Sequence, residues 1–454
     1  MNINEYIEFL SHNKTERECV EYAERVLRNH GFKMRNEIVN WEYGTKVYYK
    51  NKEKNIAAFI IGKHYDDYGL NLLGAHIDSP RLDVKTKPLY EDTGVGYFDL
   101  QYYGGIKKYQ WTTRPLAIHG IICKTDGSKI NVKLGDTGSG YTFCITDLLP
   151  HLEKDEDKKT PIEGEKLDLL LGAMKIDEKE EKGLVKKNIL KLLKDQYLIE
   201  EDDLISAELE VVPAGEATYV GLDKSMIGGY GQDDRVCAWT SLMALIDVAE
   251  EYHWDNTTQK NIPNVPERTI GCVLVDKEEV GSICATGSES RWLEDVIYNV
   301  SQSIDRNDLA TVLSNTNMLS SDVTAAYDPL YGDVSNKDMT AKLGGGFMLS
   351  KYNGGRGKSG GADANPEYIA CVRKVLNDSK VKYQFDTMGK VDVGGGGTIA
   401  SIVCRLNLNV MDAGVPVLNM HSPFEITHVE DIKNTFEGYK AFLKSNIEVF
   451  KVEY

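Results

Sequence analysis

The chain has 454 residues and a mass of 50.8 kDa, more than one hydrophobic core normally organises, so two domains or one domain with a large insertion are expected. Hydrophobic residues make up 41% and charged residues 27%, as in soluble globular proteins, and the formal net charge is −17. This acidic balance argues against nucleic acid and anionic membranes as partners, because both need a basic face.

The N-terminal stretch MNINEYIEFLSHNKTERE is polar and lacks the apolar centre of a signal peptide. No apolar run reaches the ~18–20 residues that span a bilayer. Eight cysteines occur without a C-x-x-C pair, and several, such as Cys272 and Cys404, lie in apolar runs as reduced core cysteines do. The sequence therefore indicates a cytoplasmic enzyme.

The first predicted helix starts at a capping box, Thr15-Glu16-Arg17-Glu18, and runs to Asn29. Strands are then expected at Tyr48-Tyr49, Ile56 to Gly62 and Leu70 to Ala75, each bounded by turn residues. Residues 90–145 are rich in Gly, Tyr and Thr in short alternating runs, as in an all-β module.

Residues 152–204 are dense in Lys and Glu, which is typical of a solvated face or linker, and contain one amphipathic helix around Leu184 to Leu198. From Ser225 onward, helical patterns alternate with short apolar strands. The prediction is an α/β catalytic domain formed by residues 1–90 and 226–454, interrupted by a β-rich insertion at residues 91–225.

The segment GGRGKSGG, Gly354 to Gly361, invites comparison with a phosphate-binding loop. A Walker motif requires glycine five residues before Gly357, but that position is Tyr352, and no apolar strand immediately precedes the segment. The segment is therefore predicted to be a glycine loop, and a nucleotide site is excluded.

Acidic residues and histidines recur at the ends of apolar runs or the start of a helix. They are His76 and Asp78 in LNLLGAHIDSP, Asp233 and Asp234 in GQDDR, Glu278 and Glu279 in VLVDKEEVGS, Asp322 in LSSDV, and His421 in VPVLNMHSPFE. In an α/β sheet, groups at the carboxyl ends of strands converge on one crevice. Two imidazoles and several carboxylates suit a pair of zinc ions that share one carboxylate and activate a water molecule.

Each of these features also has a simpler explanation. Paired glutamates often follow a strand that runs into solvent, and most histidines are core or surface residues rather than ligands. Asp233 or Asp234 can cap the following helix, and Asp322 can be a turn residue. Their occurrence together in one chain favours a metal site.

The order and wording of these segments resemble the aspartyl aminopeptidase family, co-catalytic dizinc exopeptidases with an α/β/α catalytic domain. The matching segments extend from His76 to Glu425 and are AHIDSPRLDVK, YYGGIKKYQWTTRPLAIHG, SAELEVVPA, GQDDR, DKEEVGS, SSDVTAAYDP, GGGGTI and NMHSPFE. The resemblance implies an α/β/α zinc-exopeptidase domain with a mixed central sheet and an inserted β-rich domain.

The resemblance also implies a role for each residue that matches a family motif. His76 and Asp322 are the terminal ligands of one zinc, and Glu279 and His421 are those of the other. Asp233 is the bridging aspartate, preferred over Asp234 because its spacing to Leu242 reproduces that of the family. Asp78 is the carboxylate that orients an imidazole, and Glu278 is the general base.

For the substrate pocket, the resemblance implies Lys351 and the glycine loop that contains Gly396 and Thr398. The chain departs from the family at Ala325, where a histidine near the substrate is common, and at Asp328, where a second histidine is usual. We therefore expect neutral N-terminal residues to be cleaved at least as well as Asp or Glu.

The expected substrates are peptides with a free N-terminus, and the expected cofactors are two divalent ions, zinc or alternatively cobalt or manganese. The family further suggests a homo-oligomer, a dodecamer that is assembled through the inserted domain. Two other functions stay open: a dizinc amidohydrolase or deacylase that acts on small metabolites, and a non-catalytic scaffold with the same fold. All five ligand positions are retained, which disfavours the scaffold.

Overall fold

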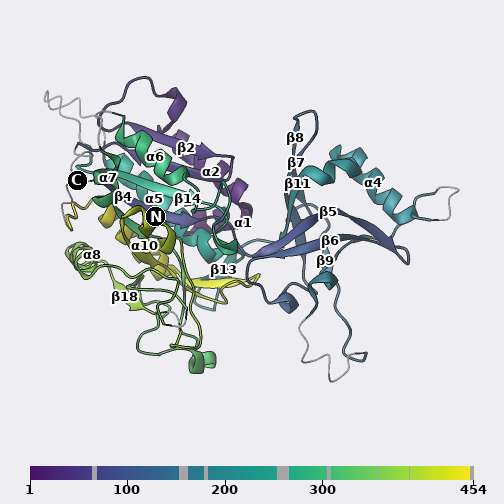
Figure 1. The fold of residues 1–454 in the computed structure, drawn as a ribbon. Coiled ribbons are helices and arrows are strands. Elements are labelled where there is room, and N and C mark those ends of the chain that lie inside the picture. Colours follow the sequence, from purple (N-terminus) through teal and green to yellow (C-terminus); the bar gives the residue numbers. More distant parts are fainter. Residues whose placement is uncertain are drawn as a thin grey trace. The chain divides into compact units, whose positions relative to one another are not determined.

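The computed structural model describes residues 1–63, 69–152, 162–177, 182–252, 265–303, 308–355, 357–387 and 389–449 (Figure 1). The chain divides into two compact units. The α/β unit comprises Met1–Asp78, Ala217–Met420 and Phe424–Tyr454, and the β-rich unit comprises Ser79–Glu216 and His421–Pro423. Parts of the predicted charge-dense stretch, residues 153–161 and 178–181, and Arg356 of the predicted glycine loop lie outside the described residues.

The observed boundaries differ from the predicted insertion at residues 91–225. The β-rich unit begins at Ser79 because β5 (Arg81–Asp92) is one continuous strand that pairs with β6 (Val95–Tyr103). It ends at Glu216 because β13 (Met226–Gly229), with its neighbour β12 (Thr218–Val220), pairs with β21 (Glu425–His428) in the α/β unit.

A nine-stranded mixed sheet forms the centre of the α/β unit. In spatial order its strands are β1 (Lys33–Met34), β2 (Lys46–Asn51), β3 (Asn55–Ile60), β14 (Thr269–Val275), β4 (Leu70–His76), β15 (Asn317–Ser320), β19 (Asn409–Gly414), β17 (Phe347–Ser350) and β18 (Tyr383–Asp386). Strands β14, β4, β15 and β19 run parallel to one another, so their carboxyl ends lie at one edge of the sheet.

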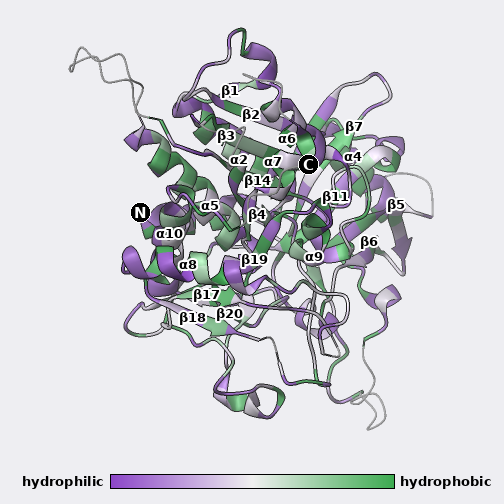
Figure 2. Ribbon diagram, turned by 60° about the vertical axis from the view of Figure 1, so that its left-hand side comes forward, coloured by the Kyte–Doolittle hydropathy of each residue, from purple (hydrophilic) through white to green (hydrophobic). Residues whose placement is uncertain are grey.

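The central strands are buried along their whole length, and alternate residues enter two separate cores. In β3, Ile56 and Ala58 pack into one core, whereas Phe59 packs into the other, and the strand has the hydrophobic colour in Figure 2. Period-two alternation sends neighbouring side chains to opposite faces, so these strands need apolar residues at every position.

Helices cover both faces of this sheet, which confirms the predicted α/β/α architecture with a mixed sheet. One core contains side chains from α1 (Ile3–His12), α2 (Glu16–Asn29), α5 (Gln232–Glu251), α8 (Pro366–Asp378) and α10 (Val429–Leu443). The other contains side chains from α6 (Trp292–Ser301), α7 (Leu309–Ser314) and α9 (Ala400–Val403). A second, five-stranded sheet has the order β12-β13-β21-β20-β16, where β20 is Pro416–Leu418 and β16 is Thr324–Ala325.

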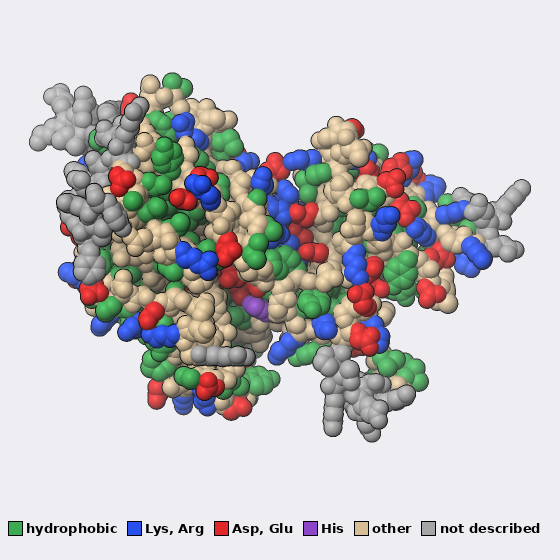
Figure 3. All heavy atoms as spheres, viewed as in Figure 1, with side chains coloured by type: hydrophobic (Ala, Val, Ile, Leu, Met, Phe, Trp, Pro, Cys, Tyr) green, Lys and Arg blue, Asp and Glu red, His purple; other side chains and the backbone are tan. Residues whose placement is uncertain are grey.

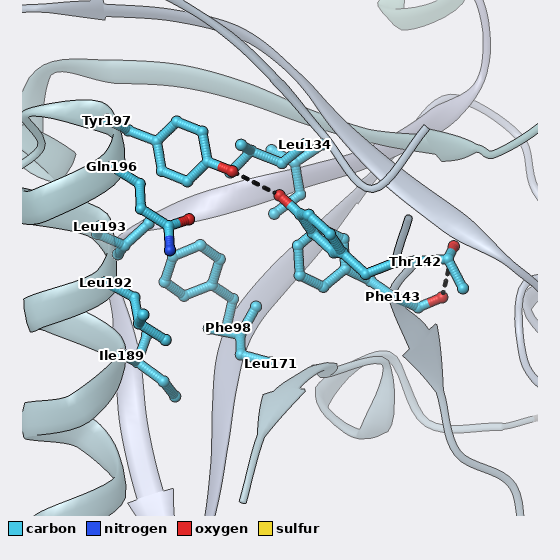
Figure 4. A pocket seen from close by; sticks show the side chains of 12 residues that line it. Phe98, Leu134, Thr142, Phe143, Leu171, Ile189, Leu192, Leu193, Gln196 and Tyr197 are labelled. Carbon is cyan, nitrogen blue, oxygen red and sulfur yellow. Dashed lines mark hydrogen bonds between the residues drawn. The ribbon is translucent and has the colours of Figure 1, made fainter. Parts of the chain in front are cut away.

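The β-rich unit contains a seven-stranded antiparallel sheet. Its order is β8 (Lys129–Leu134), β7 (Leu116–Cys123), β11 (Ala207–Pro213), β5, β6, β10 (Leu169–Gly172) and β9 (Cys144–Ile145). Helix α4 (Leu184–Tyr197), which the sequence predicts, packs near β6 and leaves an uncharged cavity of about 370 Å³ (Figure 4). The hydroxyl groups of Tyr141 and Tyr197 are hydrogen-bonded across it at 2.8 Å. Among the described helices, none combines the length and the apolar character needed to cross a bilayer.

The predicted capping box of α2 is present. The Thr15 side chain accepts a hydrogen bond from the backbone N–H of Glu18 at 3.3 Å, and the Glu18 carboxylate accepts one from the N–H of Thr15 at 3.2 Å. Both residues therefore satisfy N–H groups that the first turn of a helix leaves unbonded.

We expect Thr15→Ala to lower the free energy of unfolding by about 1 kcal/mol, because the N–H of Glu18 loses its acceptor. Thr15→Ser keeps the hydroxyl and should retain most of that stability. Urea denaturation of the two variants and the parent measures the difference. Equal losses in both variants would mean that the threonine methyl group, rather than the cap, stabilises this position.

Candidate active site

Three neighbouring strands bring most of the predicted site residues to one edge of the central sheet. Strand β4 ends at His76, β14 ends opposite it at Val275 and continues into Glu278 and Glu279, and β15 ends two residues before Asp322. The first turn of α5 adds Asp233 and Asp234. The structure thus brings together, within the α/β unit, residues that are up to about 250 positions apart in the sequence.

His76 is held with one ring nitrogen toward the acidic residues. Its Nδ1 lies 3.0 Å from the backbone carbonyl oxygen of Asp78, and its Nε2 lies 3.2 Å from Asp233 Oδ1. Because a carbonyl oxygen only accepts hydrogen bonds, Nδ1 carries the hydrogen. The lone pair of Nε2 is then available to a cation at the side of Asp233.

Asp233 and Asp234 interrupt the regular backbone of α5 and point to different surroundings. Both have non-helical φ/ψ angles, and the peptide bond between them is cis. The N–H of Asp233 donates to Glu425 Oε2 at 3.0 Å, and its carboxylate lies beside His76. Asp234 is fully buried, and burial raises the pKa of its carboxyl well above the ordinary value. The geometry therefore favours Asp233 over Asp234 as the residue that faces a bound cation.

Asp78 positions the two glutamates through their backbone. Its Oδ1 accepts the N–H of Glu278 at 3.1 Å, and its Oδ2 accepts the N–H of Glu279 at 3.2 Å. The same carboxylate lies 3.3 Å from His76 Nδ1. These glutamates open a short 3-10 turn, η6 (Glu278–Val280), whose side chains are partly exposed. Asp78, which is predicted to orient an imidazole, therefore also holds the turn that carries both glutamates.

The charges of the site repel one another unless a cation is present. Ligand atoms of His76, Asp233 and Asp322 lie within 4.8 Å of one another, and so do those of His76, Glu278 and Glu279. Burial raises the pKa of Asp322 well above the ordinary value, and repulsion from Asp234 raises it further. Burial opposes the charged imidazole, but hydrogen bonds with Asp233 and Asp78 raise the pKa of His76 well above its usual range. This cluster of carboxylates favours bound positive charge.

His421 follows β20 and is grouped with the β-rich unit. Its Nδ1 lies 3.0 Å from the carbonyl oxygen of Gly105, and a side chain at Gly105 would approach that nitrogen to 3.2 Å. By the argument given for His76, His421 also carries its hydrogen on Nδ1 and has Nε2 available as a ligand.

Comparison with known proteins identifies the family. The family model "Aminopeptidase I zinc metalloprotease (M18)" matches residues 9–443. The chain belongs to the M18 aminopeptidase family. A probable M18 family aminopeptidase 1 from Clostridium acetobutylicum is 46% identical over 447 residues, which cover 96% of this chain and 93% of that protein.

Solved structures of M18 aminopeptidases have the same fold as this chain. The crystal structure of an M18 aminopeptidase from Thermotoga maritima is 43% identical, with a TM-score of 0.90 and coverage of 97% of this chain and 95% of that one. A Saccharomyces cerevisiae mApe1 dodecamer has a TM-score of 0.76 at 23% identity, covering 98% and 96% of the two chains, and shares the fold. The predicted resemblance to the aspartyl aminopeptidase family is confirmed, and the protein is a metallo-aminopeptidase, a hydrolase of peptide bonds.

The residues predicted for the substrate pocket of this M18 chain differ in their exposure and in their hydrogen bonds. Lys351 is exposed immediately after β17. The carbonyl oxygen of Gly396 accepts the N–H of Gly354 at 2.8 Å, so the two glycine loops lie side by side. The hydroxyl of Thr398 donates a hydrogen bond to Asp412 Oδ1 at 2.7 Å, and the Asp412 carboxylate is buried.

The two residues that differ from the family pattern, Ala325 and Asp328, both lie in or next to short elements of secondary structure. Ala325 lies in β16 and is half-buried. Asp328 caps the short 3-10 helix η7 (Pro329–Val334) by accepting the N–H of Leu330 at 2.9 Å.

Sequence reasoning did not assign a role to Glu425, which holds the backbone of Asp233. The residue lies in the quoted segment NMHSPFE, but the signal is weak, since an acidic residue at the start of a strand is usually exposed. Glu425 is instead 1% exposed. Its acceptor role depends on the pairing of β21 with β13, which places it opposite Gly229, four residues before Asp233.

The different surroundings of the two aspartates lead to a test. We expect Asp233→Asn to abolish the binding of a metal pair, because a neutral amide is a poor shared ligand, whereas Asp234→Asn should retain at least part of the metal. Elemental analysis of both purified variants after dialysis against zinc buffer measures this. Loss of metal in Asp234→Asn with retention in Asp233→Asn would assign the ligand role to Asp234.

Proposed function

We propose that the protein is a dizinc aminopeptidase that removes the N-terminal residue from peptides. His76 and Asp322 are the terminal ligands of one ion, Glu279 and His421 are those of the other, and Asp233 is shared. The observation that carries this proposal is the cluster of imidazole and carboxylate donors at the ends of β4, β14 and β15. Nitrogen and oxygen donors in this combination fit zinc, and cobalt or manganese are the alternatives.

Bound zinc ions polarise the scissile carbonyl and lower the pKa of a water molecule. In the proposed mechanism, the Glu278 carboxylate accepts a proton from the attacking water and then delivers it to the departing amine. Glu278 Oε2 lies 4.0 Å from His76 Nε2, and its side chain is 19% exposed, so it lies beside the donor cluster and remains accessible. Asp78 keeps this glutamate in place through its N–H.

The negative site also suits the substrate. An exopeptidase substrate brings a protonated α-amine, and the carboxylates of the cluster attract that charge. We propose that peptides with a free N-terminus are the substrates and that Lys351, Gly396 and Thr398 lie along the pocket. Since the Thr398 hydroxyl donates to Asp412, its proposed contribution is to shape the glycine loop rather than to donate to the substrate.

We further propose a homo-oligomer, with the β-rich unit as the pairing surface and a dodecamer as its final state. The support is the fold shared with the yeast dodecamer. Partly exposed hydrophobic residues of the β-rich unit, such as Tyr109, Leu148, Leu152 and Met174, suit such contacts. On the face drawn in Figure 3, acidic and basic side chains are mixed, which agrees with protein partners rather than nucleic acid. We propose a cytoplasmic location on the sequence argument alone.

An amidohydrolase or deacylase with the same metal centre is the rival function. Aminoacyl-anilides and N-acylated amino acids separate the two, because only an aminopeptidase requires a free amine. Cleavage of the first set alone by the zinc-loaded protein supports the proposal. Cleavage of the second set alone would replace it with the rival function, and inactivity toward both, with metal bound, would favour a non-catalytic scaffold.

Glu278→Gln should lower kcat by ~10²–10⁴-fold while zinc content stays as in the parent, because Glu278 is assigned to proton transfer and not to metal binding. Steady-state kinetics and elemental analysis on one preparation measure both. Glu279→Gln is the matched comparison and should lose metal. Loss of metal from Glu278→Gln would exchange the two roles.

Ala325 and Asp328 bear on which N-terminal residue of the substrate is preferred. An acidic substrate side chain lacks the histidine that relatives have at the Ala325 position and meets a second acidic residue, Asp328. At an effective dielectric of ~20, a like-charge contact near 4 Å costs roughly 4 kcal/mol before screening. We therefore expect kcat/KM for Leu- and Ala-anilides to equal or exceed that for Asp- and Glu-anilides in one buffer with one metal. A strong preference for Asp or Glu would contradict this expectation.

A further inference from the structure

The turn that carries Glu278 and Glu279 depends on contacts at its base. Lys277, Gly281 and Ser282 all have positive φ angles, and η6 has only three residues. A turn of this length has few hydrogen bonds of its own, so its position is set by the groups that hold its two ends. Asp78 holds it from one side through two N–H groups.

Asp276 holds the turn from the other side. Its Oδ1 accepts the N–H of Lys277 at 2.8 Å, and its Oδ2 accepts the hydroxyl of Thr286 at 2.8 Å. This carboxylate therefore joins both ends of the segment 276–286. The side chains of Asn51 and Asn55 also donate to the carbonyl oxygens of Ala285 and Thr286, each at 2.7 Å.

A buried lysine lies next to Asp276. Lys54 Nζ is 3.8 Å from Asp276 Oδ2 and 3.0 Å from Glu16 Oε1, and its side chain is only 7% exposed. Glu16 and Asp276 are fully buried. A second cation, Lys277 Nζ, lies 3.7 Å from Asp276 Oδ2 but on a more exposed side chain.

The backbone fixes where this lysine lies. Lys52 and Glu53 have positive φ angles and form the tight turn between β2 and β3, closed by the N–H of Lys54 to the carbonyl of Asn51. Strand β3 pairs antiparallel with β14, with Ile56 opposite Leu274. Lys54 and Asp276 each lie two residues beyond that pair, on the side where β14 leads into the two glutamates.

A buried ammonium group loses its hydration, so it persists where carboxylates compensate its charge. Here the ion pairs of Lys54 with Glu16 and Asp276 connect three elements: the start of α2, the β2–β3 turn, and the base of the glutamate turn, the turn that carries Glu278 and Glu279. We propose that Lys54 is a positioning residue for catalysis, which holds Asp276 and thereby fixes the distance of the Glu278 carboxylate from the reacting centre. This inference rests on the proposed role of Glu278 as general base.

The test measures kcat, KM and metal content of Lys54→Met in the parent and in a Glu278→Gln background. Methionine keeps the length of the side chain and removes the charge. We expect kcat to fall about tenfold or more in the parent background, as for groups that support a catalytic ligand. KM and metal content should stay unchanged, and kcat should fall no further in the Glu278→Gln background, because two residues that act through one step are not additive.

Lys50→Met is the matched control. Lys50 lies on the same hairpin and pairs with Glu24 at 2.5 Å, away from the glutamate turn, so its loss should leave kcat unchanged. If Lys54→Met fails to fold, Asp276→Asn removes the same ion pair with nearly the same shape and should give the same pattern.

An unchanged kcat in Lys54→Met, an equal fold loss of kcat in both backgrounds, or a loss of metal from Lys54→Met would each overturn the inference. Failure of the proposed function gives a different result. In that case the parent protein, loaded with zinc, does not cleave aminoacyl-anilides, or Glu278→Gln is as active as the parent.

Discussion

The structure depends on one electrostatic constraint, the crowding of carboxylates around His76 at the carboxyl ends of three parallel strands. Asp233, Asp322, Glu278 and Glu279 lie close to its imidazole, and Asp234, the next residue after Asp233, is fully buried. Without compensation these groups cannot all be ionised, as the raised pKa of Asp322 and that of Asp234 indicate. A fold that collects such groups and keeps several of them buried is stabilised when it binds cations, and this is the physical reason that it suits a metalloenzyme.

The fold arranges these donors by simple means. Parallel pairing of β14, β4 and β15 puts three strand ends side by side, and apolar residues on both faces of each strand anchor them between two helical layers. The donors themselves lie just beyond the regular strands. Their orientation then comes from polar groups behind them: Asp78 holds the backbone of both glutamates, and Glu425 holds that of Asp233.

Local sequence patterns were sufficient for several elements of the fold. The strand expected at Leu70 to Ala75 is β4, which ends one residue later at His76, and the capping box at Thr15 begins α2 as expected. The N-terminal helix α1 was not predicted, because its apolar residues Tyr6, Phe9 and Leu10 are dispersed in a polar stretch and acquire a partner only when α5 packs against them. The site residues could be proposed from sequence motifs, because the functional residues of each motif lie within a few positions of one another in the sequence.

The hydrogen bonds and ion pairs that orient the site residues could not be predicted from local sequence motifs. Asp78 and Glu279 are separated by 201 positions, and Lys54 and Asp276 come together only through the register of β3 with β14. Thr398 was proposed for the substrate pocket from its glycine loop, yet its hydroxyl bonds to Asp412 on a separate strand. Such long-range hydrogen bonds follow from strand order and register, which no local pattern encodes.

In the proposed metal site, two ions share Asp233. Anomalous diffraction from crystals of the zinc-loaded protein, measured on both sides of the zinc absorption edge, tests it directly. We expect two anomalous peaks ~3.5–4 Å apart, one beside His76 and Asp322, the other beside Glu279 and His421, with the Asp233 carboxylate between them. A single peak, or two peaks that do not share Asp233, would contradict it.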